Sequence, residues 1–345
     1  MDLPLIWAGL IAVAVMLYVL LDGFDLGVGM LCHFADDEEE RSMMTATIEP
    51  VWDGNETWLV LGGGGLFAAF PLAYAIIMPA FYLPITIMLA ALIFRGVAFE
   101  FRHKAVRKTT KRFWNGAFAG GSFAAAAMQG LILGAFVQGI AVEGRAYAGG
   151  PFDWLTPFSV LTSASVIIGY VLLGACWLVL KTEGPTQQGA RKWARRALLG
   201  ATIAMAAVSL ATLSIDPRVT ERWGVSMSAI DFSKFITVAP VPIITAALII
   251  WLWRDVVMKP EKAPDWRPYL LSAGVFLTGY VGLAISLFPY NVPFAKTIWE
   301  TAARDNALGL MLAGAGVMLP VILIYTVYVY SLFWGKVKPG DGYHG

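Results

Sequence analysis

The sequence predicts an all-α polytopic membrane protein with about nine transmembrane helices. Of its 345 residues, 58% are hydrophobic and only 14% are charged, a composition too apolar for a soluble domain. The hydrophobic residues also gather into runs of about twenty, the length that a helix needs to cross roughly 30 Å of hydrocarbon. These two observations place most of the chain inside a lipid bilayer.

Nine apolar runs qualify as membrane-spanning helices. No soluble domain fits between them, so we expect a single transmembrane domain over residues 1–345. Any internal boundary could only divide the helices into groups. The expected spans are approximately 4–31, 50–71, 78–101, 116–140, 157–180, 196–215, 235–254, 268–288 and 307–334.

The ends of these runs carry residues that begin or stop helices. The first run continues to about Leu31 and lacks a basic start and a small-residue cleavage site, so we expect a retained helix and not a cleaved signal peptide. Pro50 suits the first position of the second helix, and Pro71 its end. The later breaks are Gly149-Gly150-Pro151, Asp216-Pro217 and the segment 289–293.

Lys and Arg are distributed unevenly between the loops. The loops after the third, fifth and seventh helices, with Arg41 and the C-terminal tail, hold about eighteen basic residues, against about six on the other side. The positive-inside rule therefore places the N-terminus outside and the C-terminus in the cytoplasm. A net charge of +1, with the basic residues confined to short loops, argues against a nucleic-acid partner.

Two acids lie inside the first apolar run, where a carboxylate costs several kcal/mol unless it meets a partner, a cavity or a proton path. They are Asp22 and Asp25, whose i, i+3 spacing places them on one helix face. If Trp7 is an anchor at the outer interface, Asp22 lies about 22 Å deeper, at 1.5 Å per residue. The pair then belongs to the cytoplasmic half of the membrane.

Two further helices bring charge to the same depth. Asp53 and Glu56 fall in the first turns of the second helix, and Arg95 and Glu100 lie towards the end of the third. We expect Asp53, Glu56 and Arg95 to converge with the two acids of the first helix, in a cluster that can relay protons inward. Three alternatives remain open. Asp22 and Asp25 would only be interfacial residues, Asp53 and Glu56 would only have a capping or interfacial role at a helix N-terminus, and Arg95 would only be a counter-ion.

Small residues and the few metal-binding residue types also bear on function. Gly23 and Gly27 form a small-xxx-small face, which predicts close helix packing, with a hinge or ligand approach as the alternative. The run Gly62–Gly65 predicts the same in the second helix. None of the three histidines lies deep in a span, so we expect neither a haem ligand nor a metal site in this chain. They are His33, His103 and His344.

Three polar segments interrupt the apolar runs: Asp22–Gly29, Trp52–Leu59 and Phe94–Arg102. Together they resemble the signature segments of subunit II of the cytochrome bd-type quinol oxidases, and the resemblance extends to Trp334. The residue pairs Asn55-Glu56 and Arg95-Gly96 favour the cyanide-insensitive branch of this family. The uncharged residues that the signature contributes are Gly23, Gly27, Trp52, Gly54, Asn55 and Trp58.

The resemblance implies two four-helix bundles, approximately 1–140 and 157–288, with a peripheral helix at 307–334. It implies a respiratory-chain complex of the bacterial cytoplasmic (inner) membrane in which subunit I holds two haems b and one haem d, oxidises quinol and reduces dioxygen to water. The present chain would be the haem-free subunit that stabilises the complex and shapes its proton and dioxygen paths.

The resemblance also assigns roles and partners. It makes Asp22, Asp25 and Asp53 proton-path residues and Arg95 their electrostatic partner, and we add Glu56 to the path and Glu100 to the partners. Some members hold a structural quinone in this subunit. Subunit I, small single-helix accessory subunits, membrane lipid and quinone are the implied partners.

Two other functions fit the same residues. A proton-coupled secondary transporter also needs intramembrane acids and glycine-broken helices, but it usually shows an internal repeat, which this sequence lacks. A purely scaffolding membrane subunit would tolerate neutral residues in place of the acids. The sequence does not separate scaffolding from proton delivery.

Overall fold

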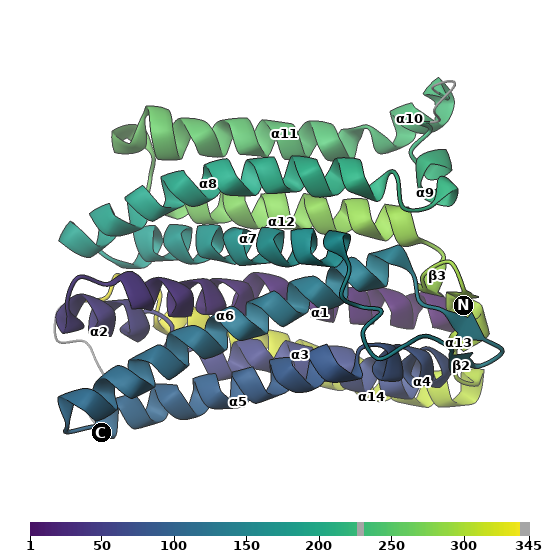
Figure 1. Cartoon of the computed structure of the whole chain (residues 1–345), viewed down its shortest axis with the longest axis horizontal. Helices are drawn as coiled ribbons and strands as arrows, with labels where there is room; N and C mark the ends of the chain where they lie inside the picture. The colour runs from purple at the N-terminus through teal and green to yellow at the C-terminus, as the bar shows by residue number, and fades with distance from the viewer. Residues whose placement is uncertain (226–230, 339–345) are drawn as a thin grey trace.

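The computed structural model describes residues 1–225 and 231–338, apart from the side chain of His103, and His344 lies outside these ranges. Within them, eight helices are long and apolar enough to cross a membrane, and they run side by side along the long axis (Figure 1). The fold is therefore all-α and polytopic. The eight are α1 (Leu3–Leu31), α5 (Tyr82–Lys104), α6 (Lys108–Gln138), α7 (Pro157–Lys181), α8 (Gly184–Thr212), α11 (Pro240–Trp253) with the π turn that continues it to Met258, α12 (Trp266–Leu287) and α14 (Asp305–Leu332).

The ninth expected span corresponds to α3 (Trp52–Ala69), which packs along α1. Its polar first turns lower its hydropathy below that of the other eight. A short apolar helix, α4 (Pro71–Ala80), follows it, and the next helix begins at Tyr82 instead of about residue 78. The expected starts of α6 and α8 at 116 and 196 were also wrong, because the first turns of both helices are polar and extend beyond the apolar runs.

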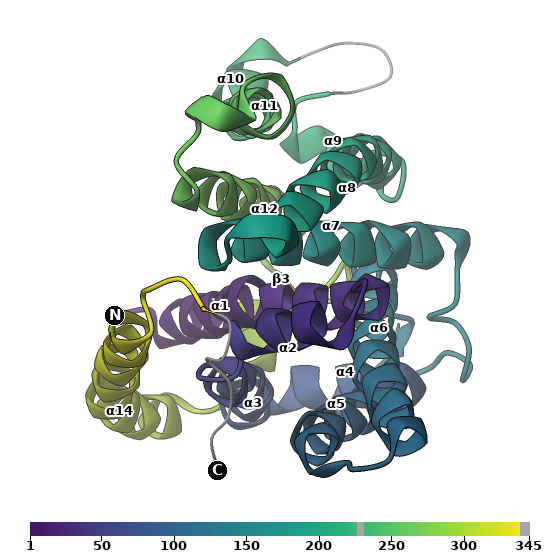
Figure 2. The ribbon, with the colours of Figure 1, turned by 90° about the vertical axis from the view of Figure 1, so that its left-hand side faces the viewer.

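The helices form two groups on either side of the contact between α1 and α7. Figures 1 and 2 show α7, α8, α11 and α12 in one group and α1, α3, α5 and α6 in the other, with α14 lying along α1 and α3. The central helix is α1, which contacts α3, α6, α7 and α14. A side chain in the middle of α1 can therefore reach several helices at once.

Short elements close the two ends of the molecule. Helix α2 lies at the end of the molecule that holds the loops after α5, α7 and α11 (Figure 1). The remaining elements complete the connections. The short elements are η1 (Cys32–Phe34), α2 (Glu38–Ala46), the hairpins β1–β2 (Val142–Glu143, Ala146–Tyr147) and β3–β4 (Tyr290–Val292, Lys296–Thr297), α9 (Pro217–Arg222), α10 (Phe232–Val238), the π turn η2 (Arg254–Met258), η3 (Pro260–Lys262) and α13 (Ile298–Thr301).

Trp7, the reference point for the depth of Asp22, is buried between two helices. Its side chain is 7% exposed, and its Nε1 atom donates a hydrogen bond of 3.0 Å to the carbonyl oxygen of Leu308. The indole therefore ties the first turns of α1 to α14. An indole N–H that is buried needs such an acceptor, and the packing of α14 supplies it.

Candidate functional site

The two acids of α1 lie in the interior of the helix assembly. Asp22 and Asp25 have no exposed surface, although nothing in the local sequence of α1 neutralises them. Burying two carboxylates without partners would be far too costly for a folded protein. Their partners come from α3 and α5, as the sequence predicts.

Arg95 reaches the acids from α5. Its Nη1 atom lies 3.0 Å from Oδ1 of Asp22 and 2.7 Å from Oε1 of Glu56. The guanidinium carbon lies 6.0 Å from the centre of the Trp52 ring, and Arg95 is completely buried. One cation thus joins an acid of α1 to an acid of α3 in a water-poor environment, where paired charges are held firmly in place.

Asn55 holds the second acid. Its Nδ2 atom donates to Oδ2 of Asp25 at 2.7 Å and to the carbonyl oxygen of Leu21 at 3.3 Å. Its Oδ1 atom accepts a hydrogen bond of 2.9 Å from the hydroxyl of Tyr330 on α14. A single amide side chain of α3 therefore links α1 to the last helix of the chain.

A chain of hydrogen bonds continues from the acids towards α6 and α7. Tyr18 precedes Asp22 by one turn and interacts with it. Gln129 of α6 donates from Nε2 to the Tyr18 hydroxyl at 2.6 Å and accepts at Oε1 from the Tyr170 hydroxyl of α7 at 2.7 Å. Sequence reasoning missed these three residues and Tyr330. A lone Gln within the Ala-rich part of α6 was the signal available.

Several polar atoms of the cluster have no protein partner among the described residues. They are Oδ2 of Asp22, Oδ1 of Asp25, and Nε and Nη2 of Arg95, all of them buried. Buried polar atoms are nearly always hydrogen-bonded to protein or to ordered water. The cluster therefore has free hydrogen-bonding capacity beside both carboxylates.

The comparisons with known proteins identify the family. A family model described as cytochrome bd terminal oxidase subunit II matches residues 3–333. The chain belongs to this family. As subunit II of a bd-type quinol oxidase it is one part of an oxidoreductase complex of the membrane, whose haems lie in the partner oxidase subunit.

Curated relatives and a solved structure agree with this assignment. Cytochrome bd-I ubiquinol oxidase subunit 2 of Escherichia coli (strain K12) is 27% identical over 98% of this chain and 96% of its own length. Cytochrome bd ubiquinol oxidase subunit 2 of Bacillus subtilis (strain 168) is 30% identical over 96% of each chain. A chain of the bd oxidase from Geobacillus thermodenitrificans shares the fold, with a TM-score of 0.74 at 16% identity, over 97% of this chain and 100% of that one.

Not every candidate residue of this bd oxidase subunit joins the buried cluster. The structure brings together Asp22, Asp25, Glu56 and Arg95, and the Glu56 side chain is 24% exposed at the edge. Asp53 lies on the exposed side of α3, close enough to Glu56 to interact with it through charge. Glu100 is also exposed and lies outside the cluster.

The glycines of subunit II differ in what they face. A Cβ atom on Gly27 would lie 1.9 Å from the carbonyl oxygen of Tyr170 and 2.9 Å from the backbone nitrogen of Gly174, so α1 and α7 touch backbone to backbone there. At Gly23 a Cβ atom would lie 2.7 Å from the Tyr170 ring. Gly54, by contrast, faces open space. The first two fit the expected packing role.

Two aromatic signature residues frame the cluster. Trp52 lies beside the Arg95 guanidinium. A Cβ atom on Gly96 would lie 3.4 Å from the Trp52 ring, so the glycine leaves room for this ring. Trp58 is 4% exposed and packs with Ala14 and Tyr18 of α1. Both rings help to exclude solvent from the sides of the acid cluster, which strengthens its internal electrostatics.

A second charged cluster lies at the end of subunit II that holds α2. Glu38 pairs with Arg41 at 2.7 Å, with Arg102 at 3.1 Å and with Lys111 at 3.1 Å. Arg102 is 2% exposed and also donates to Oγ1 of Thr45 at 2.9 Å. The acidic segment after α1 is therefore not a free loop, because it folds back onto α5 and α6.

Proposed function

We propose that this subunit delivers protons to the haem-bearing subunit of the oxidase through Glu56, Asp22 and Asp25. Asp53 would lie at the entrance of this path, on the exposed side of α3. The observation that carries the proposal is the bridge made by Arg95, which holds the partly exposed Glu56 and the fully buried Asp22 on one nitrogen atom. Titratable groups thus extend from the edge of α3 to the core of α1. Acids placed within reach of one another and of water are the usual proton relay inside membranes.

The partner subunit supplies the redox chemistry in this proposal. It holds two haems b and one haem d, oxidises quinol and reduces dioxygen to water, which consumes protons at the site of reduction. The complex lies in the bacterial cytoplasmic membrane, with the basic loops after α5, α7 and α11 in the cytoplasm. Protons then enter from the cytoplasmic side, near Glu56. Single-helix accessory subunits and a structural quinone are compatible with this assembly.

Neutral variants of the acids in the intact complex test the proposal. We expect Asp22→Asn, Asp25→Asn and Glu56→Gln each to lower quinol-driven oxygen consumption roughly tenfold or more, because a positioned proton-transfer group typically contributes 10²–10⁴-fold. The haem spectrum of each purified complex reports assembly. Glu143→Gln, an exposed acid of the β1–β2 hairpin, is the matched control and should retain full turnover.

A scaffolding role is the second candidate, and the same cluster gives the reason for it. Arg95 pairs with two carboxylates, and such an arrangement can serve only to join α1, α3 and α5. Wild-type turnover in all three acid variants, with normal haem content, would assign the cluster to structure. The family assignment leaves the transporter alternative without support.

A further inference from the structure

A groove on the group formed by α7, α8, α11 and α12 combines an apolar wall with two exposed cationic side chains. It has a volume of about 450 Å³ and lies between α8 and the end of α11. Ile249, Ile250, Trp253 and Met258 make the apolar part. The hydroxyl of the seventh lining residue, Thr202, is already bonded to the carbonyl oxygen of Leu198 at 2.8 Å, so the wall offers little to a polar ligand.

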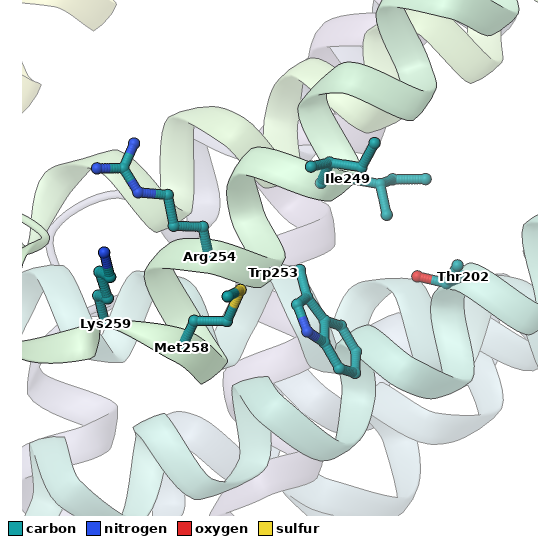
Figure 3. Close-up of a pocket in the computed structure, with 7 residues that line it drawn as sticks. Thr202, Ile249, Trp253, Arg254, Met258 and Lys259 are labelled. Carbon is teal, nitrogen blue, oxygen red and sulfur yellow. The ribbon is translucent and has the colours of Figure 1, made fainter.

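The π turn places both cations at one end of this groove. The backbone N–H of Lys259 donates to the carbonyl oxygen of Arg254 at 2.8 Å, an i to i+5 bond. Residues five apart in an α-helix are about 140° apart around the axis, whereas the hydrogen bond of this wider turn joins Lys259 directly to Arg254. Figure 3 shows the two side chains together on one side of Trp253, with Ile249 and Thr202 on the other. Such π turns often occur at functional sites.

The acid nearest in sequence does not neutralise these cations. Asp255 is 1% exposed and turns inward to Arg267 of α12, whose Nη2 atom lies 2.8 Å from its Oδ1 atom. Asp265, the N-cap residue of α12, is held by Arg191 and Lys336 at 2.6 Å each. The exposed Glu261 forms no ion pair with either cation among the described residues. Arg254 and Lys259 are both exposed, and neither forms an ion pair within residues 1–225 and 231–338.

We propose that this groove binds an anionic phospholipid. Its phosphodiester would lie between Arg254 and Lys259, and one acyl chain would lie along Ile249, Ile250 and Trp253. Charge complementarity selects this occupant. A quinone has no charge and phosphatidylcholine has no net negative charge to balance the two cations, and free phosphate leaves the apolar wall uncovered. Basic pockets between transmembrane helices typically hold anionic headgroups. Trp251 and Trp266 nearby are exposed, as is usual at a membrane interface.

Native mass spectrometry of the purified complex tests the site. The complex is titrated with phosphatidylglycerol and, separately, with phosphatidylcholine of the same acyl chains. We expect one phosphatidylglycerol to be retained preferentially. Because a basic side chain at the membrane surface is worth about fivefold in affinity for anionic lipid, Arg254→Gln with Lys259→Gln should weaken this binding roughly twenty-fold. High salt should weaken wild-type binding as well.

Two further variants make the result decisive. Arg107→Gln with Lys108→Gln removes the same charge from the exposed start of α6 and should leave the retained lipid unchanged. Ile249→Trp keeps both cations but fills the groove, and it should also release the lipid. Three outcomes would overturn the proposal. The wild-type complex would retain the two lipids equally, the two double variants would lose phosphatidylglycerol equally, or Ile249→Trp would retain it fully. The haem spectrum verifies assembly of every variant.

Discussion

The Nη1 atom of Arg95 lies 3.0 Å from Oδ1 of Asp22, and neither side chain has any exposed surface. The two residues are 73 positions apart and belong to α5 and α1. Removing a cation and a carboxylate from water is compensated only while they remain paired. Each residue therefore depends on the other, and substitutions at the two positions should not have equal effects.

Removal of the cation should destabilise the complex more than removal of an acid. Arg95→Ala leaves Asp22 and Glu56 without their shared partner, and breaking a buried pair in this way typically costs about 3–5 kcal/mol. We expect a lower unfolding temperature and a lower haem content after purification. Arg112→Ala, at an exposed position of α6, removes the same charge and should change stability by less than about 0.5 kcal/mol.

A second substitution separates the ion pair from the packing of the Arg95 side chain. Adding Asp22→Asn to Arg95→Ala removes one of the uncompensated charges, so part of the lost stability should return, as expected for residues in direct contact. An unfolding temperature in Arg95→Ala equal to that of the wild type would show that the pair is dispensable.

Loss of the Asn55 amide should loosen α14. Asn55→Leu leaves Oδ2 of Asp25 and the Tyr330 hydroxyl without their partner, at a cost of about 1–3 kcal/mol for each buried group left unbonded. Thermal unfolding and proteolysis of the intact complex measure the effect. Asn306→Leu, at an exposed position in the first turn of α14, is the control. Matching unfolding curves for the two variants would contradict the proposed link.

The depth of the charged residues could be predicted from the sequence. The direction in which each side chain points could be predicted only for some of them. Hydropathy and the rise per residue were enough to bring Asp22, Glu56 and Arg95 to one level. Glu100 follows Arg95 by five residues, about 140° around the helix, so the two side chains cannot both face the core. Helix rotation, which depends on all neighbours together, decided that Arg95 is the buried one.

The long-range partners were beyond sequence reasoning for a different reason. Tyr330 joins the network through Asn55 and Gln129 joins it through Tyr18, only because α14 and α6 pack beside α1. A single sequence does not state which helices become neighbours. The starts of α6 and α8 were missed because a basic helical turn outside the bilayer has no apolar run to mark it. The π turn likewise has no signature in hydropathy.

A methyl group at Gly27 should force α1 and α7 apart. The Cβ atom of Gly27→Ala would lie 1.9 Å from the carbonyl oxygen of Tyr170, and a backbone atom cannot move aside as a side chain can. Overpacking of this kind typically costs about 1–3 kcal/mol. Gly9→Ala, in the same helix, has nothing within 4 Å of the added atom and should be neutral or slightly stabilising. Equal unfolding temperatures for both variants would argue against the close contact.

Acid should weaken the attachment of α2 through Glu38. Partial burial raises the pKa of this carboxyl, but hydrogen bonds from Lys111 and Arg41 and the charge of Arg102 lower its pKa overall, below the usual value. A carboxyl whose pKa is lower in the folded than in the unfolded state contributes stability above the unfolded pKa and loses it as the pH falls through the folded pKa. Between about pH 5 and pH 3, we therefore expect the wild-type unfolding temperature to fall more steeply than that of Glu38→Gln. Glu39→Gln, which removes an exposed neighbouring acid, should retain the wild-type slope, and a flattened slope in both variants would show that the effect is not specific to Glu38.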